Sequence, residues 1–116
     1  MIKIKRIYEK PSKDDGYRIL VDRLWPRGVS KSQAKVDLWL KEVTPTDLLR
    51  KWYSHDPEKW TKFQKFYKSE LKERLGSLGK IKQIEKEKKI VTLLYAAKDT
   101  KHAHALVLLD VLKKLN

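Results

Sequence analysis

Two short segments of this 116-residue sequence carry most of the side chains that bind anions or transfer protons. The first, residues 22–28, holds an aspartate, a tryptophan and two arginines, with a proline and a glycine that shape the backbone. Guanidinium groups bind phosphate and carboxylate groups through paired hydrogen bonds. The segment therefore predicts an anion clamp built from Arg23 and Arg27. Trp25 would lie beside the clamp, and Asp22 would orient its basic groups.

The second segment, residues 95–104, combines small residues with cationic and titratable ones. Its two alanines allow a ligand to approach the backbone closely, and the N-terminus of a helix expected after them adds positive potential. We expect Lys98 to add charge here, Asp99 to orient the basic groups and His102 to transfer a proton. Tyr95 stands at the start of this segment and is expected to contact the ligand.

A third candidate, His55, stands just before an Asp-Pro pair that starts a helix. It is a second general base if it reaches the ligand, and otherwise it makes a structural hydrogen bond. The residues of the two loops can also have purely structural roles. Asp22 can form an ion pair with Arg23, Trp25 can close the end of the core, and Asp99 can cap a helix. The expected catalytic residues are Asp22, Asp99 and His102, and the expected ligand-binding residues are Arg23, Trp25, Arg27, His55, Tyr95 and Lys98.

The sequence carries no metal or cofactor signature beside these residues. It has no cysteine, which excludes disulfides, a thiol nucleophile and zinc sites built on cysteine. His102 and His104 stand two positions apart, so on a helix they would point in different directions and could not share one ion. Four glycines at these spacings make neither a P-loop nor a dinucleotide-binding turn. We therefore expect neither a metal nor a cofactor.

Length and charge define the class of protein. Lys and Arg number 28 against 15 Asp and Glu, which gives a formal net charge of +13, while 41% of the residues are apolar. This composition supports the core of a single domain over residues 1–116 and is unlike that of a disordered basic tail. There is no signal-peptide pattern and no run of roughly 18 apolar residues, so we expect a cytoplasmic protein without membrane attachment. The sequence does not set an oligomeric state.

Strands must bring the two candidate site segments, residues 22–28 and 95–104, to one edge of a sheet. Residues 2–8 alternate apolar and polar side chains, and residues 17–22 form a short apolar run that ends in charge, so both are expected to be strands. Residues 90–95 form a continuous apolar and β-branched run, which is typical of a strand buried on both faces. We predict an α/β fold, a small sandwich with a short, partly parallel central sheet flanked by helices on both sides.

Helices are expected between the second and third strands and after the third. A capping-box spacing predicts the first helix, and a proline at its first position predicts the second. Apolar residues at spacings of three and four predict the third helix. Its expected buried stripe is Trp60, Phe63, Tyr67, Leu71 and Leu75. Gly76 and Gly79 are expected to end that third helix. The helices are expected over residues 31–41, 45–52, 57–75 and 80–88, with a last one capped by Asp99 or Thr100.

Lysines occupy the outer arc of the helix expected over residues 57–75. Such an arc can follow a phosphate backbone by charge alone, although lysines on a solvent face commonly serve only solubility. A basic nucleic-acid-binding module without catalytic activity is therefore the alternative to an anion-binding site. A third possibility is an adaptor that binds a protein through exposed Trp and Tyr. The lysines of the arc are Lys59, Lys62, Lys65, Lys68 and Lys72.

Several stretches, taken in order, resemble one protein family. The most specific are Val-Asp-Arg-Leu-Trp-Pro-Arg-Gly at residues 21–28 and Tyr-Ala-Ala-Lys-Asp at residues 95–99. The pattern is similar to the bacterial and archaeal YeaO-like proteins of domain-of-unknown-function family 488, over nearly the whole chain. The resemblance implies a compact α/β fold and brings no established reaction. A more distant branch carries cysteines in the segment matching residues 95–104, and its thiol chemistry does not transfer to this chain.

Overall fold

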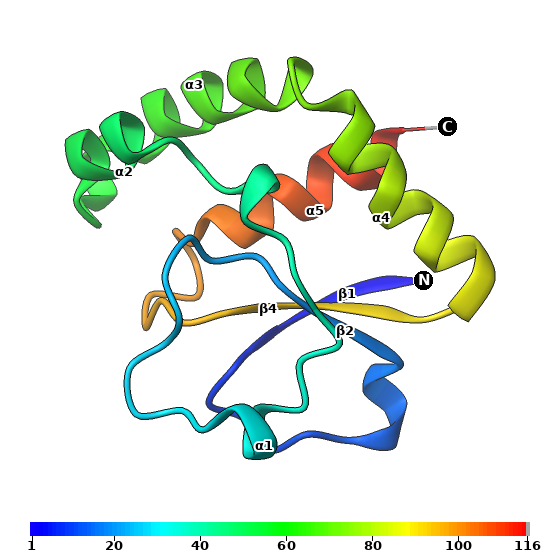
Figure 1. The fold of residues 1–116 in the computed structure, drawn as a ribbon. Coiled ribbons are helices and arrows are strands. Elements are labelled where there is room, and N and C mark those ends of the chain that lie inside the picture. Colours follow the sequence, from blue (N-terminus) through cyan, green and yellow to red (C-terminus); the bar gives the residue numbers. More distant parts are fainter. Residues whose placement is uncertain (116) are drawn as a thin grey trace.

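The computed structural model describes residues 1–115, and a four-stranded sheet lies at its centre (Figure 1). The strands lie in the order β1-β4-β2-β3, and every pairing among the described residues is parallel. The α/β fold is confirmed, and its sheet is more regular than the partly parallel one expected. The strands are β1 (Ile2–Arg6), β2 (Tyr17–Leu20), β3 (Leu38–Trp39) and β4 (Val91–Tyr95).

Strand β4 lies in the middle of the sheet, with β1 on one side and β2 on the other. All five of its residues are buried, as the apolar run at residues 90–95 predicted. Its side chains alternate between two cores: Leu93 packs into the larger one and Leu94 into the smaller one. This alternation follows from the period of two along a strand, and both faces of the strand are therefore shielded from solvent.

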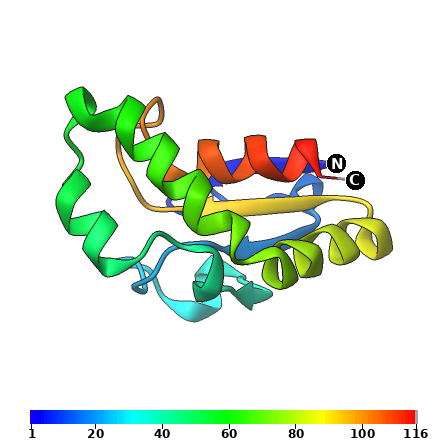
Figure 2. The same cartoon turned by 90° about the horizontal axis from the view of Figure 1, so that it is seen from above.

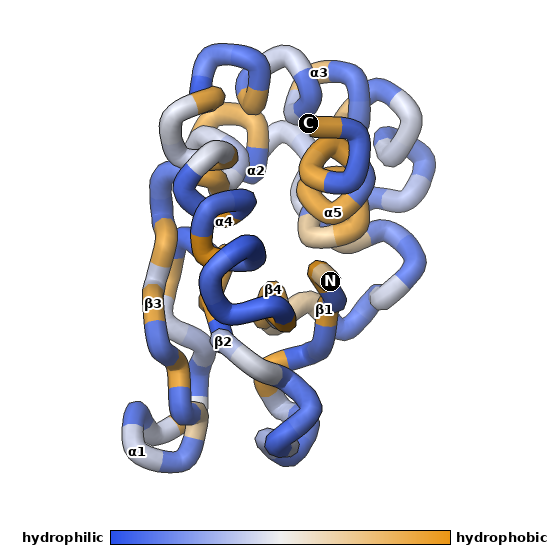
Figure 3. The backbone as a smooth tube through the Cα atoms, turned by 90° about the vertical axis from the view of Figure 1, so that its right-hand side faces the viewer, coloured by the Kyte–Doolittle hydropathy of each residue, from blue (hydrophilic) through white to orange (hydrophobic). Residues whose placement is uncertain are grey.

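Helices cover the two faces unequally (Figures 1 and 2). The larger core lies between the sheet and a layer made of the four later helices, and the smaller core contains Ala34 of the first helix. Figure 3 shows that the last helix, which packs over the sheet, is mostly hydrophobic. The helices are α1 (Lys31–Ala34), α2 (Asp47–Tyr53), α3 (Trp60–Lys72), α4 (Leu75–Lys88) and α5 (His104–Lys114).

The helix expected over residues 31–41 is wrong beyond its first turn. Ser30 caps it as predicted, but the backbone of Lys35 turns into the left-handed region, with φ 49°, and the chain then enters β3. There Asp37 forms two hydrogen bonds with the backbone of Arg18, both at 2.8 Å. The backbone N–H of Asp37 donates to the Arg18 carbonyl oxygen, and the carboxylate of Asp37 accepts from the Arg18 N–H. Pairing with β2 therefore overrides the local helix signal. A short 3₁₀ turn (Lys41–Val43) follows β3.

The long helix expected over residues 57–75 ends earlier, and the two glycines do not end it. Helix α3 stops at Lys72 and α4 begins at Leu75, so Gly76 and Gly79 lie inside α4. The break is held by the guanidinium of Arg74, which donates to the carbonyl oxygens of Glu42 and Thr44 at 2.6 and 3.1 Å. Phe63, Tyr67 and Leu71 are buried as predicted, whereas Trp60 is half-buried and Leu75 is 60% exposed.

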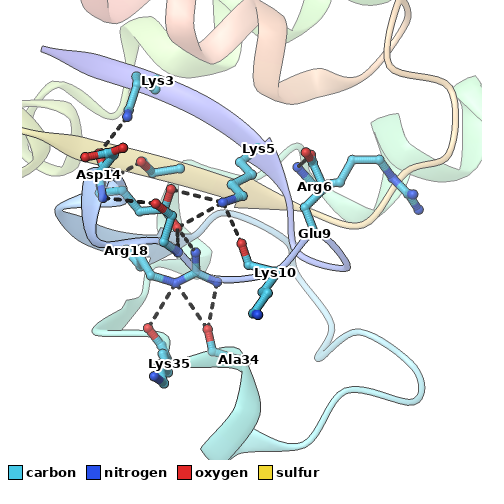
Figure 4. A network of polar contacts seen from close by, with 12 residues as sticks. Lys3, Lys5, Arg6, Glu9, Lys10, Asp14, Arg18, Ala34 and Lys35 are labelled. Atoms are coloured by element: carbon cyan, nitrogen blue, oxygen red, sulfur yellow. Dashed lines mark hydrogen bonds and ion pairs between the residues drawn. The ribbon is translucent and has the colours of Figure 1, made fainter.

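The face of the sheet that α1 covers also holds a buried polar network (Figure 4). The carboxylate of Asp15 accepts hydrogen bonds from the guanidinium of Arg18 and from Lys5 Nζ, the latter at 3.1 Å. Thr92 in β4 donates its hydroxyl to the carbonyl oxygen of Asp15 at 2.6 Å. Burial opposes ionisation of Asp15, but the hydrogen bonds from the Ser12 N–H, Lys5 and Arg18 outweigh it and lower the pKa of the carboxyl. The network thereby ties the first turn of the chain to β2 and β4.

Among residues 1–115, none of the helices combines the length and the apolar character that a membrane span requires.

Candidate functional site

A crevice opens where β2 and β4 end. These strands are neighbours and parallel, so their carboxyl ends lie at the same edge of the sheet. The chain leaves β2 toward α1 on one face and leaves β4 toward α5 on the other face (Figure 1). Segments that diverge in this way leave space between them, and ligands of open α/β sheets bind at such switch points. Asp22 and Asp99 follow these two strands and therefore lie at one end of the sheet, as expected.

A cavity of about 470 Å³ occupies this crevice. Much of its wall is apolar, from Leu24, Trp25 and Pro26 after β2, from Ala96 and Ala97 after β4, and from aromatic rings of α2 and α3. Among the described residues, three arginines and three histidines line it against a single carboxylate. These titratable residues are Asp22, Arg23, Arg27, Arg50, His55, His102 and His104.

The loop after β2 is fixed by hydrogen bonds from aromatic side chains. Trp25 Nε1 donates to the carbonyl oxygen of Val29 at 2.7 Å, and the Tyr8 hydroxyl donates to that of Arg27 at 2.9 Å. Gly28 has φ +76°, a conformation that favours glycine, and it turns the chain back toward α1. The loop therefore presents Arg27 from a backbone that is held at both ends.

Asp22 joins the two loops. Its carboxylate accepts a hydrogen bond from the Ala96 N–H at 2.9 Å, and its other oxygen lies 3.5 Å from Nε2 of His104. Burial raises the pKa of Asp22, while charge on His104, the Ala96 hydrogen bond and charge on His55 oppose that rise. Burial thus disfavours the charged form of this carboxyl, and the contacts with Ala96 and His104 favour it.

The guanidinium of Arg23 is partly occupied by contacts within the protein, and that of Arg27 makes none among the described residues. Arg23 donates from Nε and Nη2 to the carbonyl oxygen of Pro45, at 3.2 and 3.0 Å, and lies 3.5 Å from the carboxylate of Asp47. Arg50 lies 3.3 Å from the same carboxylate. The local Asp22–Arg23 ion pair considered above is therefore not formed. Within residues 1–115 the guanidinium of Arg27 has no hydrogen bond or ion pair, so its donors face solvent at the cavity.

The second loop places His102 against Asp99. The carboxylate of Asp99 lies 2.7 Å from His102 Nδ1 and also accepts from the N–H groups of Lys101 and His102. The hydrogen bond with His102 lowers the pKa of Asp99. Asp99 therefore caps the turn over residues 99–102, and the prediction that Asp99 or Thr100 caps the last helix is wrong, because α5 begins at His104 after Ala103.

Tyr53 holds the other side of His102. Its hydroxyl donates to the His102 carbonyl oxygen at 2.8 Å, and its ring stacks on Phe63 with 4.2 Å between centroids. Burial raises the pKa of Tyr53 to about 12, so the hydroxyl keeps its proton at neutral pH. The imidazole of His102 meets the ring of Trp60 edge to face at 5.5 Å. Helices α2 and α3 thereby fix the loop that follows β4.

Six of the nine predicted site residues line the cavity, and three do not. Tyr95 is buried in β4 within the larger core, Lys98 is exposed to solvent, and Asp99 reaches the site through His102. His55 does reach the cavity, from a backbone with φ 57°. The residues at the cavity are Asp22, Arg23, Trp25, Arg27, His55 and His102.

The sequence interpretation missed four residues that build the site. His104, Arg50 and Tyr53 line the cavity, and Arg6 at the end of β1 donates to the carbonyl oxygens of Ala96 and Ala97 at 3.0 and 2.9 Å. His104 stands in the candidate segment at residues 95–104, so the sequence pointed to it. The last helix was expected to begin earlier, near Asp99, whereas His104 is its first residue. Arg50 and Tyr53 lie on a helix brought in by tertiary packing, and no local pattern marks them.

The two neighbouring histidines do not lie on one helix as assumed. His102 lies in the turn and contacts Trp60, whereas His104 is the first residue of α5 and packs against Tyr67 with 6.1 Å between centroids. Within residues 1–115, no cluster of three or more His, Asp or Glu side chains has the arrangement of a metal site.

Comparison with known proteins connects this chain to relatives along nearly its full length. It is 44% identical over 114 residues to "Uncharacterized protein YeaO" of Escherichia coli (strain K12), which covers 98% of both chains. It is 36% identical over 111 residues to "Uncharacterized protein Rv3073c" of Mycobacterium tuberculosis (strain ATCC 25618 / H37Rv), which covers 96% of this chain and 92% of the relative. No solved structure matches the chain significantly. The model of the family described as "Inactive DUF488-N3 subclade" matches residues 1–115, and the chain belongs to this family of YeaO-like proteins.

Proposed function

We propose that this protein binds a small phosphate-bearing organic anion in the cavity beyond the carboxyl ends of β2 and β4 and holds it without converting it. The observation that carries the proposal is the composition of the cavity: among the described residues, six cationic or titratable nitrogen-bearing side chains surround one carboxyl group. Burial raises the pKa of that carboxyl, which disfavours its anionic form.

Arg27 and Arg23 are the proposed clamp. Arg27 offers all its guanidinium donors, and Arg23 keeps Nη1 after bonding to the Pro45 carbonyl oxygen. A phosphate group accepts several such charge-assisted hydrogen bonds at once. Because the Pro45 contact already orients Arg23, little side-chain freedom is lost when the ligand binds.

The size and the walls of the cavity favour an organic ligand over inorganic phosphate. A volume of about 470 Å³ is within the range of small-molecule sites, which is about 300–1,000 Å³, and a bare phosphate would leave most of it unfilled. Leu24, Trp25 and Pro26 on one side and Ala96 and Ala97 on the other suit the apolar part of such a ligand.

Two observations support binding without turnover. The hydroxyl of Thr44, which lines the cavity, donates to the Lys41 carbonyl oxygen at 2.7 Å and is not paired with a base as a nucleophile would be. The family is described as an inactive subclade, which agrees with a binding role. The His102–Asp99 pair has the geometry for proton transfer, so acid-base catalysis on the ligand is the alternative that the experiment must test.

The experiment measures the melting temperature of the full chain with phenyl phosphate, inorganic phosphate and chloride at matched ionic strength. A ligand at 100 times its dissociation constant adds about 2.7 kcal/mol to stability. We expect a saturable rise that is larger with phenyl phosphate than with inorganic phosphate. The double variant R23Q/R27Q should abolish it, whereas H102A should leave most of it intact.

The matched control is K86Q/K88Q, which removes the same charge from the exposed side of α4. It should keep the saturable rise, and any general salt effect should persist in both variants. An equal rise in the wild type and in R23Q/R27Q would show that these arginines are structural and would refute the proposal. Release of phenol from phenyl phosphate by the wild type, lost in H102A, would replace binding by acid-base catalysis.

A further inference from the structure

Three large apolar side chains are exposed side by side on α2 and α3, away from the cavity. Leu48 is 83% exposed, Phe66 50% and Trp52 36%. Leu48 and Trp52 are four residues apart on α2 and share a helix face, and the ring of Trp52 meets that of Phe66 edge to face at 5.4 Å. None of the three lines the cavity. We call this surface the α2–α3 patch.

Lysines surround the patch. Lys59 Nζ lies 5.2 Å from the centre of the Trp52 ring and donates to the Trp52 carbonyl oxygen at 2.8 Å. Lys51 stands beside Trp52 on α2, and Lys62 is one helical turn before Phe66 on α3. Within residues 1–115 none of these three lysines forms an ion pair, so their charge is available to a partner.

The charges decide which kind of partner fits. A second copy of this chain in a symmetric contact would bring lysines against lysines, which disfavours self-association through the patch. A polyanion is favoured, because Lys51, Lys59 and Lys62 gather at the patch. The exposed Lys65 and Lys72 add charge on the outer arc of α3, a helix of 13 residues and about 20 Å. The whole chain carries a net charge of +13.

We propose that the α2–α3 patch binds single-stranded nucleic acid, independently of the cavity. Lysines would contact successive phosphates, and unpaired bases would stack on Phe66 and Trp52, as in other single-strand-binding surfaces. An acidic protein segment would satisfy the lysines but has no need of flat rings, so the two aromatic side chains favour a nucleic acid. A duplex hides the faces of its bases and would use the lysines alone.

Part of the lysine arc expected from the sequence does not contribute. Lys68 lies 3.5 Å from the carboxylate of Asp110 on α5, which it shares with Lys114, so its side chain is directed toward α5 and away from the patch. The proposed binding surface is therefore centred where Trp52 of α2 meets Phe66 of α3. This shifts the expected contact toward Lys51, Lys59 and Lys62.

The experiment titrates the full chain into fluorescently labelled oligothymidylate of about 12 nucleotides and follows anisotropy at several salt concentrations. Each phosphate contact of a single strand contributes about 0.7 to the salt slope. K51Q/K62Q should therefore weaken binding and lower the slope by about 1.4. F66A should weaken binding about tenfold or more with an unchanged slope, and F66Y, which keeps the ring, should bind like the wild type.

The matched control, K86Q/K88Q on α4, removes equal charge from another face and should change neither affinity nor slope. R23Q/R27Q in the cavity should also leave oligonucleotide binding unchanged, so the two proposals fail separately. The competitors are a duplex and polyglutamate of equal charge, and both should compete at least tenfold more weakly. Equal competition by polyglutamate, indicating an acidic protein segment, would overturn the proposal, as would no effect of F66A or no binding at 50 mM salt.

Discussion

The carboxylate of Asp22 lies 3.5 Å from Nε2 of His104, where the loop after β2 meets the start of α5. The same nitrogen lies 2.7 Å from the carbonyl oxygen of Val21, which can only accept a hydrogen bond, so Nε2 carries a hydrogen. In the neutral ring Nδ1 is then the acceptor. The pair thus joins a buried acid to an imidazole of fixed tautomer at the edge of the cavity.

Replacing Asp22 with Asn should make stability less dependent on pH. Because burial raises the pKa of this carboxyl above its unfolded value, the wild type loses stability as pH rises through the native pKa. An amide has no such loss and can still accept from the Ala96 N–H. Relative to the wild type, D22N should therefore gain stability as pH rises from about 4 toward neutrality, as measured by urea unfolding. A relative gain that shrinks toward pH 7 would contradict this.

The same substitution should strengthen anion binding. Asp22 is the carboxyl among the described residues that line the cavity, and removing its charge removes a repulsion. We expect the dissociation constant for phenyl phosphate, measured by calorimetry, to fall several-fold in D22N. D110N makes the same charge change on α5, outside the cavity, and should leave the constant unchanged. Weaker binding by D22N would mean that the carboxyl organises the site more than it repels the ligand.

Asp15 should be among the most sensitive polar positions. Asp15 and Arg18 form an ion pair in which each side chain is 5% exposed, and D15N would leave the guanidinium buried beside a neutral group. Loss of one partner from a buried pair costs about 3–5 kcal/mol. Because the pKa of Asp15 is lowered, the wild type should lose this stabilisation as pH falls below about 4 through the native pKa. D14N, at an exposed neighbour, should cost less than about 0.5 kcal/mol in urea unfolding.

Glycine substitutions at two positions should have opposite effects. Gly16 has φ +63°, and a Cβ there would lie 2.3 Å from the carbonyl oxygen of Ile90, so G16A should destabilise the fold by about 2 kcal/mol or more. Gly79 lies within α4 with no atom inside 4 Å of an added Cβ. G79A should therefore stabilise the chain by about 0.5–1 kcal/mol. Melting temperatures of the two variants test both signs.

The apolar stripe of α3 should show a gradient of sensitivity. Phe63 is 1% exposed and lies between Tyr53 and Tyr67, so F63A should cost about 3–5 kcal/mol. Trp60 is half-buried at the rim, and W60A should cost less than F63A. Denaturant unfolding of both variants decides the order, and a larger loss for W60A would place the centre of the packing at the N-terminal end of α3.

The sequence predicted correctly those features that depend on the composition of a single segment. The run at residues 90–95 is apolar on both faces, so its central place followed from composition, and parallel strands then brought Asp22 and Asp99 to one edge. Strand β3 could not be predicted in this way. It has two residues, and it exists because Asp37 bonds to Arg18 of β2, a contact that only the folded sheet supplies.

The cavity required tertiary information for the same reason. Arg50 reaches it from α2, which α1 and β3 separate from the loop after β2 and which α3, α4 and β4 separate from the loop after β4. The break after α3 depends on Arg74, which donates hydrogen bonds to carbonyl groups 32 and 30 residues away in the sequence. These long-range contacts leave no periodic trace in the sequence. The glycines, which local rules favour as helix ends, have no steric role where they stand in α4.

The central place of β4 also dictates the order in which the chain can fold during synthesis. Strands β1 and β2 do not pair with each other, because both pair with β4, whose residues follow them in the sequence after four helices. Until Val91–Tyr95 has left the ribosome, the edges of β1 and β2 that pair with β4 have no partner. The pairing of β2 with β3 is the one strand pairing of the sheet that can form before then. Such late, long-range pairing slows folding and prolongs the exposure of apolar strands. A nascent chain that does not yet have β4 therefore exposes apolar side chains of β1 and β2 that the folded sheet buries.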